Sequence, residues 1–126
     1  MSDIHHLFVY GTLAPNRSNS HWLTNIGGQF TAGRIRGTLI PMGWGATQGY
    51  PAVILDDAGA WIEGFLFSSP HLSEHWQALD DFEGDGYTRQ LVTVECDDGG
   101  CMTAWVYALS VNDDDKMALL EQYRQS

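Results

Sequence analysis

The sequence predicts an α+β domain in which a small, mostly antiparallel β-barrel is flanked by helices. Short apolar runs of strand length recur between clusters of Gly, Asp and Asn, which favour turns. Two later segments carry helical signals instead, and no repeat or linker-like change of composition interrupts the chain. We therefore expect one domain over residues 1–126, long enough to bury a core without metal or disulfide support.

Six runs rich in β-branched and aromatic residues predict the strands. Gly33 and Gly37 interrupt the second run, which indicates a bent or bulged strand. The turn sequence Asp-Asp-Gly-Gly at 97–100 joins the last two runs as a hairpin. In chain order, the predicted strands are His6–Tyr10, Gln29–Ile40, Tyr50–Leu55, Ala60–Ser68, Gln90–Cys96 and Met102–Leu109.

Helical signals occur in three places. A short helix is expected over Ser18–Asn25, and a longer one begins near Ser69-Pro70 and runs to about Glu83. A third begins at Asn112, a good N-cap, with three aspartates in its first turn. The acidic run at 113–115 is therefore explained by the helix N-terminus rather than by a metal site.

The helix that ends near Glu83 places one carboxylate on its apolar side. At ~100° per residue from Leu72, Trp76 falls near ~40°, Leu79 near ~340° and Glu83 near ~20°, whereas Asp81 falls near ~180°. A carboxylate aimed at a core is costly unless it is paired, protonated or functional. Desolvation would raise its pKa from about 4.3 towards neutrality, where a carboxylate can transfer protons.

Two other interpretations of Glu83 stay open. The helix could end before Gly84 and leave the carboxylate solvated, or Glu83 could form a structural ion pair with Arg89.

A glycine follows the first predicted strand, in the sequence Tyr10-Gly11-Thr12-Leu13. Successive free amides in such a loop can bind an anion such as a carboxylate, although an ordinary turn explains the same residues. The loop matches neither a dinucleotide-binding fingerprint nor a P-loop, because no Gly-x-Gly-x-x-Gly follows a strand and no Gly-Lys-Ser/Thr occurs in the chain.

Charge and composition exclude several partners. Six basic and sixteen acidic residues leave a net charge of -10, which disfavours binding to nucleic acid or to anionic membrane surfaces. The apolar runs are too short to span a bilayer, and the first residues resemble no signal peptide. We therefore expect a cytoplasmic protein in which Cys96 and Cys101 are reduced, with no assignment of its oligomeric state.

One motif suggests a metal. His71-Leu72-Ser73-Glu74-His75 matches the inverted zinc-protease pattern, and two histidines four residues apart on a helix can bind zinc. The same helix has to bury its apolar residues, and too little chain follows for a protease fold. We expect neither a metal nor a cofactor.

Seven short motifs occur together in an order typical of one family. They are Phe-Val-Tyr-Gly-Thr-Leu at 8–13, Asn-Ser-His-Trp at 19–22, Gly-Tyr-Pro-Ala-Val at 49–53, Gly-Phe-Leu-Phe at 64–67, Leu-Asp-Asp-Phe-Glu-Gly at 79–84, Tyr-Thr-Arg at 87–89 and Ala-Trp-Val-Tyr at 104–107. Over about residues 6–109 the chain resembles the gamma-glutamylcyclotransferase-like superfamily, specifically its small gamma-glutamylamine cyclotransferase-like branch.

The resemblance implies a metal-free cyclisation of a small gamma-glutamyl substrate. The substrate's α-amine would attack its own γ-carbonyl and yield 5-oxoproline and a free amine or amino acid. Glu83 would be the general acid/base, and the amides of Gly11, Thr12 and Leu13, after Tyr10, would bind the substrate.

Three further side chains are candidates for substrate binding. Tyr107, at the end of a strand, could point its hydroxyl into the cavity, and Tyr87 and Arg89 could do the same or order Glu83; for each, a packing role is an equal alternative. A binding module that keeps the fold and cavity without turnover is the alternative function.

Overall fold

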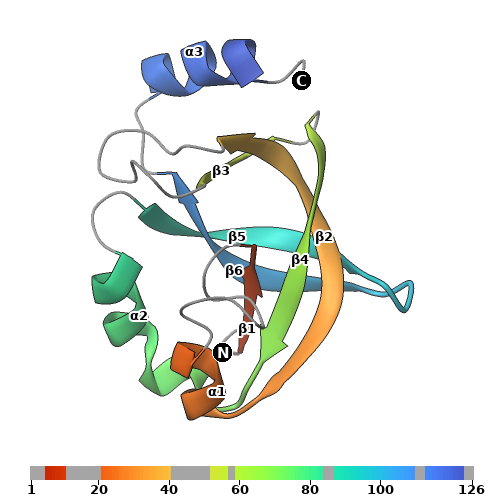
Figure 1. The fold of residues 1–126 in the computed structure, drawn as a ribbon, viewed down its shortest axis with the longest axis vertical. Helices are drawn as coiled ribbons and strands as arrows, with labels where there is room; N and C mark the ends of the chain where they lie inside the picture. Colours follow the sequence, from red (N-terminus) through yellow and green to blue (C-terminus); the bar gives the residue numbers. More distant parts are fainter. Residues whose placement is uncertain are drawn as a thin grey trace.

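The computed structural model describes residues 5–10, 21–40, 52–56, 59–83, 87–109 and 113–123, with the main chain alone at positions 22, 82, 83, 113 and 123. Figure 1 shows a curved sheet with two helices on one side and a third at one end. The strands are β1 (His6–Val9), β2 (Gln29–Ile40), β3 (Ala52–Leu55), β4 (Ala60–Ser68), β5 (Tyr87–Cys96) and β6 (Cys101–Leu109). The helices are α1 (His21–Ile26), a 3₁₀ turn η2 (Leu72–Glu74), α2 (Trp76–Glu83) and α3 (Asp113–Tyr123).

Five strands close into a ring in the order β1-β4-β2-β5-β6. All neighbours in this ring are antiparallel except β1 and β6, which run parallel and pair Phe8 with Val106. The sequence prediction of a small, mostly antiparallel barrel flanked by helices is confirmed.

The extra strand, β3, joins the ring at one end. It pairs antiparallel with the last four residues of β2 and parallel with β6 through Val53 and Ala108. One edge of β6 is thus occupied first by β1 and then by β3. Tyr107 lies between these two pairings, at the position where one neighbouring strand leaves and the other arrives.

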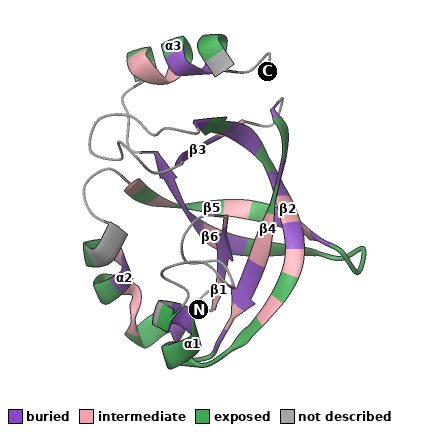
Figure 2. Ribbon diagram, in the orientation of Figure 1, coloured by how far each residue is buried: buried purple, intermediate pink, exposed green. Residues whose placement is uncertain are grey.

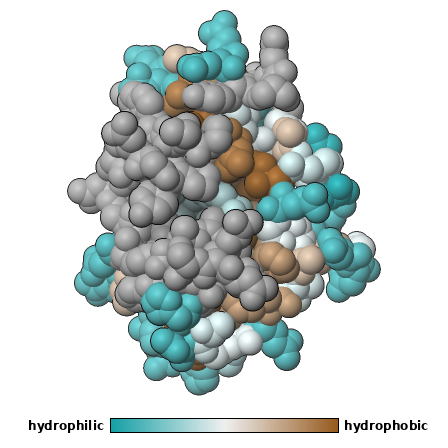
Figure 3. Space-filling model, in the orientation of Figure 1, coloured by the Kyte–Doolittle hydropathy of each residue, from teal (hydrophilic) through white to brown (hydrophobic). Residues whose placement is uncertain are grey.

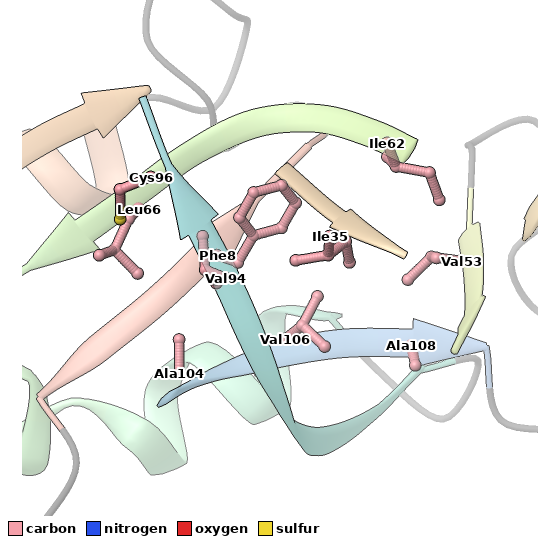
Figure 4. Packing of buried hydrophobic residues seen from close by; sticks show 10 residues of the cluster. All are labelled: Phe8, Ile35, Val53, Ile62, Leu66, Val94, Cys96, Ala104, Val106 and Ala108. Atoms are coloured by element: carbon pink, nitrogen blue, oxygen red, sulfur yellow. The ribbon is translucent and has the colours of Figure 1, made fainter. Parts of the chain in front are cut away.

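Alternating residues of each strand fill the barrel. Figure 4 shows these side chains pointing into the space between the strands. Successive strand residues point to opposite faces of the sheet. The residues that alternate with the inward-pointing ones therefore point outward, where the helices can cover them. The buried inward cluster consists of Phe8, Ile35, Val53, Ile62, Leu66, Val94, Cys96, Ala104, Val106 and Ala108.

The helices cover two outward clusters, and Figure 2 shows their exposed sides in green. Where α1 and α2 pack on the barrel, the buried residues are Leu7, Val9, Leu23, Phe67, Leu72, Leu79 and Tyr107. Where α3 packs on the barrel, they are Ile40, Ala52, Ile54, Leu109, Leu119 and Leu120. We call the first area the covered face of the barrel.

Glycine is required where the strands approach most closely. Gly33 pairs with Gly64 on one side and with Cys96 on the other, which is the position at which β2 closes the ring. A Cβ at Gly64 would collide with the carbonyl oxygen of Val9 and with the Phe8 ring. The predicted bend of β2 is therefore a consequence of ring closure at Gly33.

Gly99 is required for a different reason. It lies in the β5–β6 turn with φ +93°, which residues with a side chain rarely adopt.

The helix before Glu83 differs from its prediction at its start. The chain forms the 3₁₀ turn η2 first, and α2 begins only at Trp76. A single 100° rotation per residue therefore does not hold from Leu72 onward, because a 3₁₀ turn has three residues per turn. The main features persist, since Leu72 and Leu79 are fully buried, Asp81 is exposed and the helix reaches Glu83.

Among the other boundaries that the structure describes, one strand start differs from its prediction by more than one residue. Strand β5 begins at Tyr87 and not at Gln90, because Tyr87, Thr88 and Arg89 already pair with the end of β6. The predicted N-cap Asn112 lies outside the described residues, as does Gly11–Leu13.

Both cysteines are free thiols, although they flank the hairpin turn. Burial, together with the nearby Asp98 carboxylate, raises the pKa of the Cys96 thiol. In the part of the chain that the structure describes, no helix has the length and apolar character needed to cross a membrane.

Candidate active site

The hydroxyl of Tyr10 bridges the place where β1 leaves β6 and β3 joins it. It donates a hydrogen bond to the carbonyl oxygen of Tyr107 at 2.6 Å and accepts one from the amide of Val53 at 3.1 Å. Its ring stacks on Phe8, with centroids 6.4 Å apart. This single oxygen therefore joins three strands at the point where the predicted binding loop begins.

Two further polar contacts connect α2 to the outer side of β5 and β6. The hydroxyl of Tyr107 donates to Oδ1 of Asp80 at 2.7 Å, and Nη2 of Arg89 lies 3.4 Å from Oδ2. Arg89 and Tyr107 are directly paired across β5 and β6. The Asp80 carboxylate thus spans one cross-strand pair.

The Arg89 guanidinium is held between two aromatic rings. It lies 4.5 Å from the Trp76 ring centroid and 4.8 Å from that of Trp105. The two rings meet edge to face at 6.3 Å. The rings of Trp76 in α2 and Trp105 in β6 therefore stabilise the charge of Arg89 and restrict the orientation of its guanidinium.

The structure brings several predicted site residues onto adjacent elements. Tyr10, Arg89 and Tyr107 lie at the end of β1 and on β5 and β6, and Tyr87 packs where the covered face meets the cluster beneath α3. Glu83 is the last residue of α2, and the structure describes its main chain but not its side chain. The interpretation that Glu83 pairs with Arg89 stays untested, but the arginine's ion pair in the structure is with Asp80.

Asp80 is the residue that the sequence argument missed. The rotation used for Glu83 places position 80 at about 80°, beside the apolar stripe and next to Trp76. An acidic residue on that boundary, with Tyr107 on one predicted strand and Arg89 just before another, was a usable signal. Which strand positions face the helix could not be derived without the barrel register.

The His71–His75 motif does not form a metal cluster. His71 Nδ1 lies 3.4 Å from Glu74 Oε2 on the exposed turn before α2. Over the described ranges, no three His, Cys, Asp or Glu side chains are grouped closely enough to hold a metal ion.

These features define a class of protein: a small closed barrel whose covered face carries a helix that ends at an acidic residue, Glu83. The family model described as gamma-glutamyl cyclotransferase, AIG2-like, matches residues 7–125. The chain therefore belongs to the gamma-glutamyl cyclotransferase, AIG2-like family.

Individual relatives agree with this membership. The chain is 29% identical over 127 residues to the gamma-L-glutamyl-butirosin B gamma-glutamyl cyclotransferase of Niallia circulans, covering 94% of this chain and 76% of that protein. It is 31% identical to YkqA of Bacillus subtilis, with a TM-score of 0.65 over 86% of this chain. The match spans only 36% of YkqA. An aig2-like protein from Mus musculus shares the fold at 20% identity, with a TM-score of 0.66, covering 92% of this chain and 84% of that one.

Proposed function

We propose that this protein is a gamma-glutamyl cyclotransferase that converts a gamma-glutamyl amine or amino-acid derivative into 5-oxoproline and a free amine. The family match over residues 7–125 carries the proposal, and the cyclotransferase from Niallia circulans supports the reaction class. The arrangement of Tyr10 and α2 supports it further, because both lie against Tyr107.

The proposed reaction needs no nucleophile from the protein. The substrate's α-nitrogen forms a bond to the carbon of the γ-carbonyl, and the bond from that carbonyl carbon to the leaving nitrogen breaks. In this proposal Glu83 accepts a proton from the α-ammonium and returns it to the leaving nitrogen. Amides of Gly11–Leu13 bind the α-carboxylate or polarise the carbonyl oxygen. Holding the amine and the carbonyl in near-attack geometry supplies much of the rate enhancement.

The test is release of 5-oxoproline from a panel of gamma-glutamyl-alanine, gamma-glutamyl-ε-lysine and glutathione. We expect turnover of at least one compound by the wild-type protein. Glu83→Gln should lower kcat by about 100- to 10,000-fold, the usual contribution of a general acid/base. The matched control is Asp81→Asn, which removes an exposed carboxylate from the same helix and should leave the rate unchanged.

Two results would contradict the proposal. Full activity of Glu83→Gln would remove the acid/base assignment. No turnover of any compound, with 5-oxoproline still raising the melting temperature, would favour the alternative of a binding module.

A further inference from the structure

Helix α2 is too short to hold its own position. It has eight residues, and isolated helices of that length are marginal in water, so contacts with the barrel determine where it lies. Its apolar anchor is Leu79, which is fully buried. An apolar contact alone lets a short helix rotate or slide, since dispersion and burial are not directional. A directional contact is therefore needed to fix its final turn.

Asp80 supplies that contact one residue after Leu79. Each of its oxygens meets a different strand, Oδ1 the Tyr107 hydroxyl on β6 and Oδ2 the Arg89 guanidinium on β5. The Arg89 side chain is 25% exposed and is confined by the rings of Trp76 and Trp105. Two partners with restricted freedom define both the rotation and the height of α2.

Tyr107 also connects this contact to the predicted binding loop. Its hydroxyl binds Asp80, and its carbonyl oxygen accepts the Tyr10 hydroxyl. Position 83 follows position 80 by three residues, on neighbouring parts of the helix surface and about 4.5 Å further along the axis. One strand residue, Tyr107, thus contacts both Asp80 near the end of α2 and Tyr10 at the start of the predicted loop.

We propose that Asp80 is a positioning residue which, through Tyr107 and Arg89, holds the end of α2 at a fixed place relative to Tyr10 at the end of β1. The inference rests on the proposed function, because it gives Asp80 its role through Glu83. It assigns Tyr107 and Arg89 to the support of α2. A displacement of a catalytic group by about 1 Å can cost about 100-fold in rate.

The first experiment compares kcat and KM for Tyr107→Phe, Asp80→Ala and Asp80→Asn with those of the wild type. We expect kcat to fall about 100-fold for Asp80→Ala and about 10-fold for Tyr107→Phe, with KM changed less than about threefold. Asp80→Asn should recover part of the loss of Asp80→Ala, because its amide oxygen still accepts the Tyr107 hydroxyl. The control is again Asp81→Asn, with wild-type constants expected.

A double variant tests whether the two residues act through one bond. Adding Tyr107→Phe to Asp80→Ala should lower kcat less than about twofold further, since the shared hydrogen bond is already absent. Independent, multiplicative losses would contradict the proposal. So would wild-type kcat in Tyr107→Phe, which keeps the buried ring and is therefore expected to fold.

Hydrogen exchange separates this inference from the proposed function. The amides of residues 80–83 should exchange at least about tenfold faster in Asp80→Ala than in the wild type or in Asp81→Asn. If the wild type turns over no compound but this acceleration occurs, the cyclotransferase proposal fails and the positioning contact stands. If the wild type is active and neither exchange nor kcat responds to Asp80, the positioning role is wrong.

Discussion

Two faces of the barrel carry the same combination of side chains in different surroundings. On the covered face, Arg89 pairs with Asp80 and lies against Trp76 and Trp105. On strands β2 and β5, Arg34 pairs with Glu95, and the distance from Nη2 to Oε1 is 2.6 Å. The Arg34 guanidinium also lies 4.1 Å from the ring centroid of Trp61 in β4. We call this second area, together with its neighbouring groove, the open face.

The difference lies in what each arginine holds. The Arg34 and Glu95 side chains are 42% and 40% exposed, and they join two strands that already share backbone pairing. Arg89 joins a strand to the short helix α2, which shares no backbone pairing with the barrel and is held by side-chain contacts such as the Tyr107–Asp80 hydrogen bond. The same ion pair and aromatic contact are therefore redundant on the open face and decisive on the covered face.

The open face also contains a shallow groove of about 580 Å³. Figure 3 shows that apolar side chains reach the surface between hydrophilic ones on the side in view. The residues that line the groove are Arg36, Leu55, Asp56, Trp61, Leu91, Val92, Thr93, Glu95, Cys101 and Thr103. Aromatic and apolar groups here are exposed, whereas their counterparts on the covered face pack beneath helices.

The largest expected difference between the faces comes from one leucine on each. Leu79→Ala should cost about 2–5 kcal/mol in the free energy of unfolding, because the side chain is fully buried beneath α2. Leu91→Ala should cost less than about 1 kcal/mol, because Leu91 is 48% exposed. Urea denaturation of both variants measures the two values. Equal losses would show that the open face is buried in solution.

The two arginines provide a finer comparison. Arg89→Met should cost about 1–2 kcal/mol, since it removes a cation that is shielded between two rings and leaves Asp80 without its ion pair. Arg34→Met should cost less than about 1 kcal/mol, as is usual for an exposed pair. Both values come from denaturation in low salt and in high salt. A larger loss for Arg34 would reverse the contrast drawn between the faces.

The smallest expected effect concerns His6, at the start of β1. Its Nδ1 lies 2.7 Å from the Ser68 hydroxyl, and burial, with a smaller effect of His5, lowers the pKa of His6 below 6.5. Because the folded state disfavours the protonated form, stability is complete above about pH 6.5 and decreases as the pH falls below that value. Melting temperatures at about pH 8 and about pH 5.5 should therefore differ more for the wild type than for His6→Gln.

The matched control for that experiment is His71→Gln, on the exposed turn before α2. Its pH dependence is the baseline with which that of His6→Gln is compared. An unchanged dependence in His6→Gln would show that protonation of His6 does not contribute.

The sequence predicted the strands better than it predicted their partners. Alternation and turn-forming residues in the sequence located Gln29–Ile40 and Ala60–Ser68 to the residue. The pairing of β1 with β6 is parallel and joins distant segments, so no local pattern encodes it. The role of Asp80 depends on where α2 packs against β5 and β6, which no local pattern encodes either.

The helical-face argument agrees with the structure where the two can be compared. Helix α2 ends at Glu83 and Asp81 is exposed, as predicted, whereas the location of the Glu83 side chain on the apolar side of the helix stays a prediction, because only its main chain is described. The prediction failed at the start of the helix, where the choice between a 3₁₀ turn and an α-turn depends on packing around the buried Leu72. What Glu83, Gly11, Thr12, Leu13 and Tyr87 do in the reaction stays a prediction.

The parallel pairing of β1 with β6 has a consequence for how the chain is made. On the ribosome β1 is synthesised first, but its partner Val106 emerges almost a hundred residues later. Until then one edge of β1 has no partner, and the barrel cannot close around Phe8. Contacts of such long separation slow folding and lengthen the time for which an apolar edge is exposed. The Tyr10 hydroxyl, which needs both Val53 and Tyr107, can form its two bonds only at the last step of this assembly.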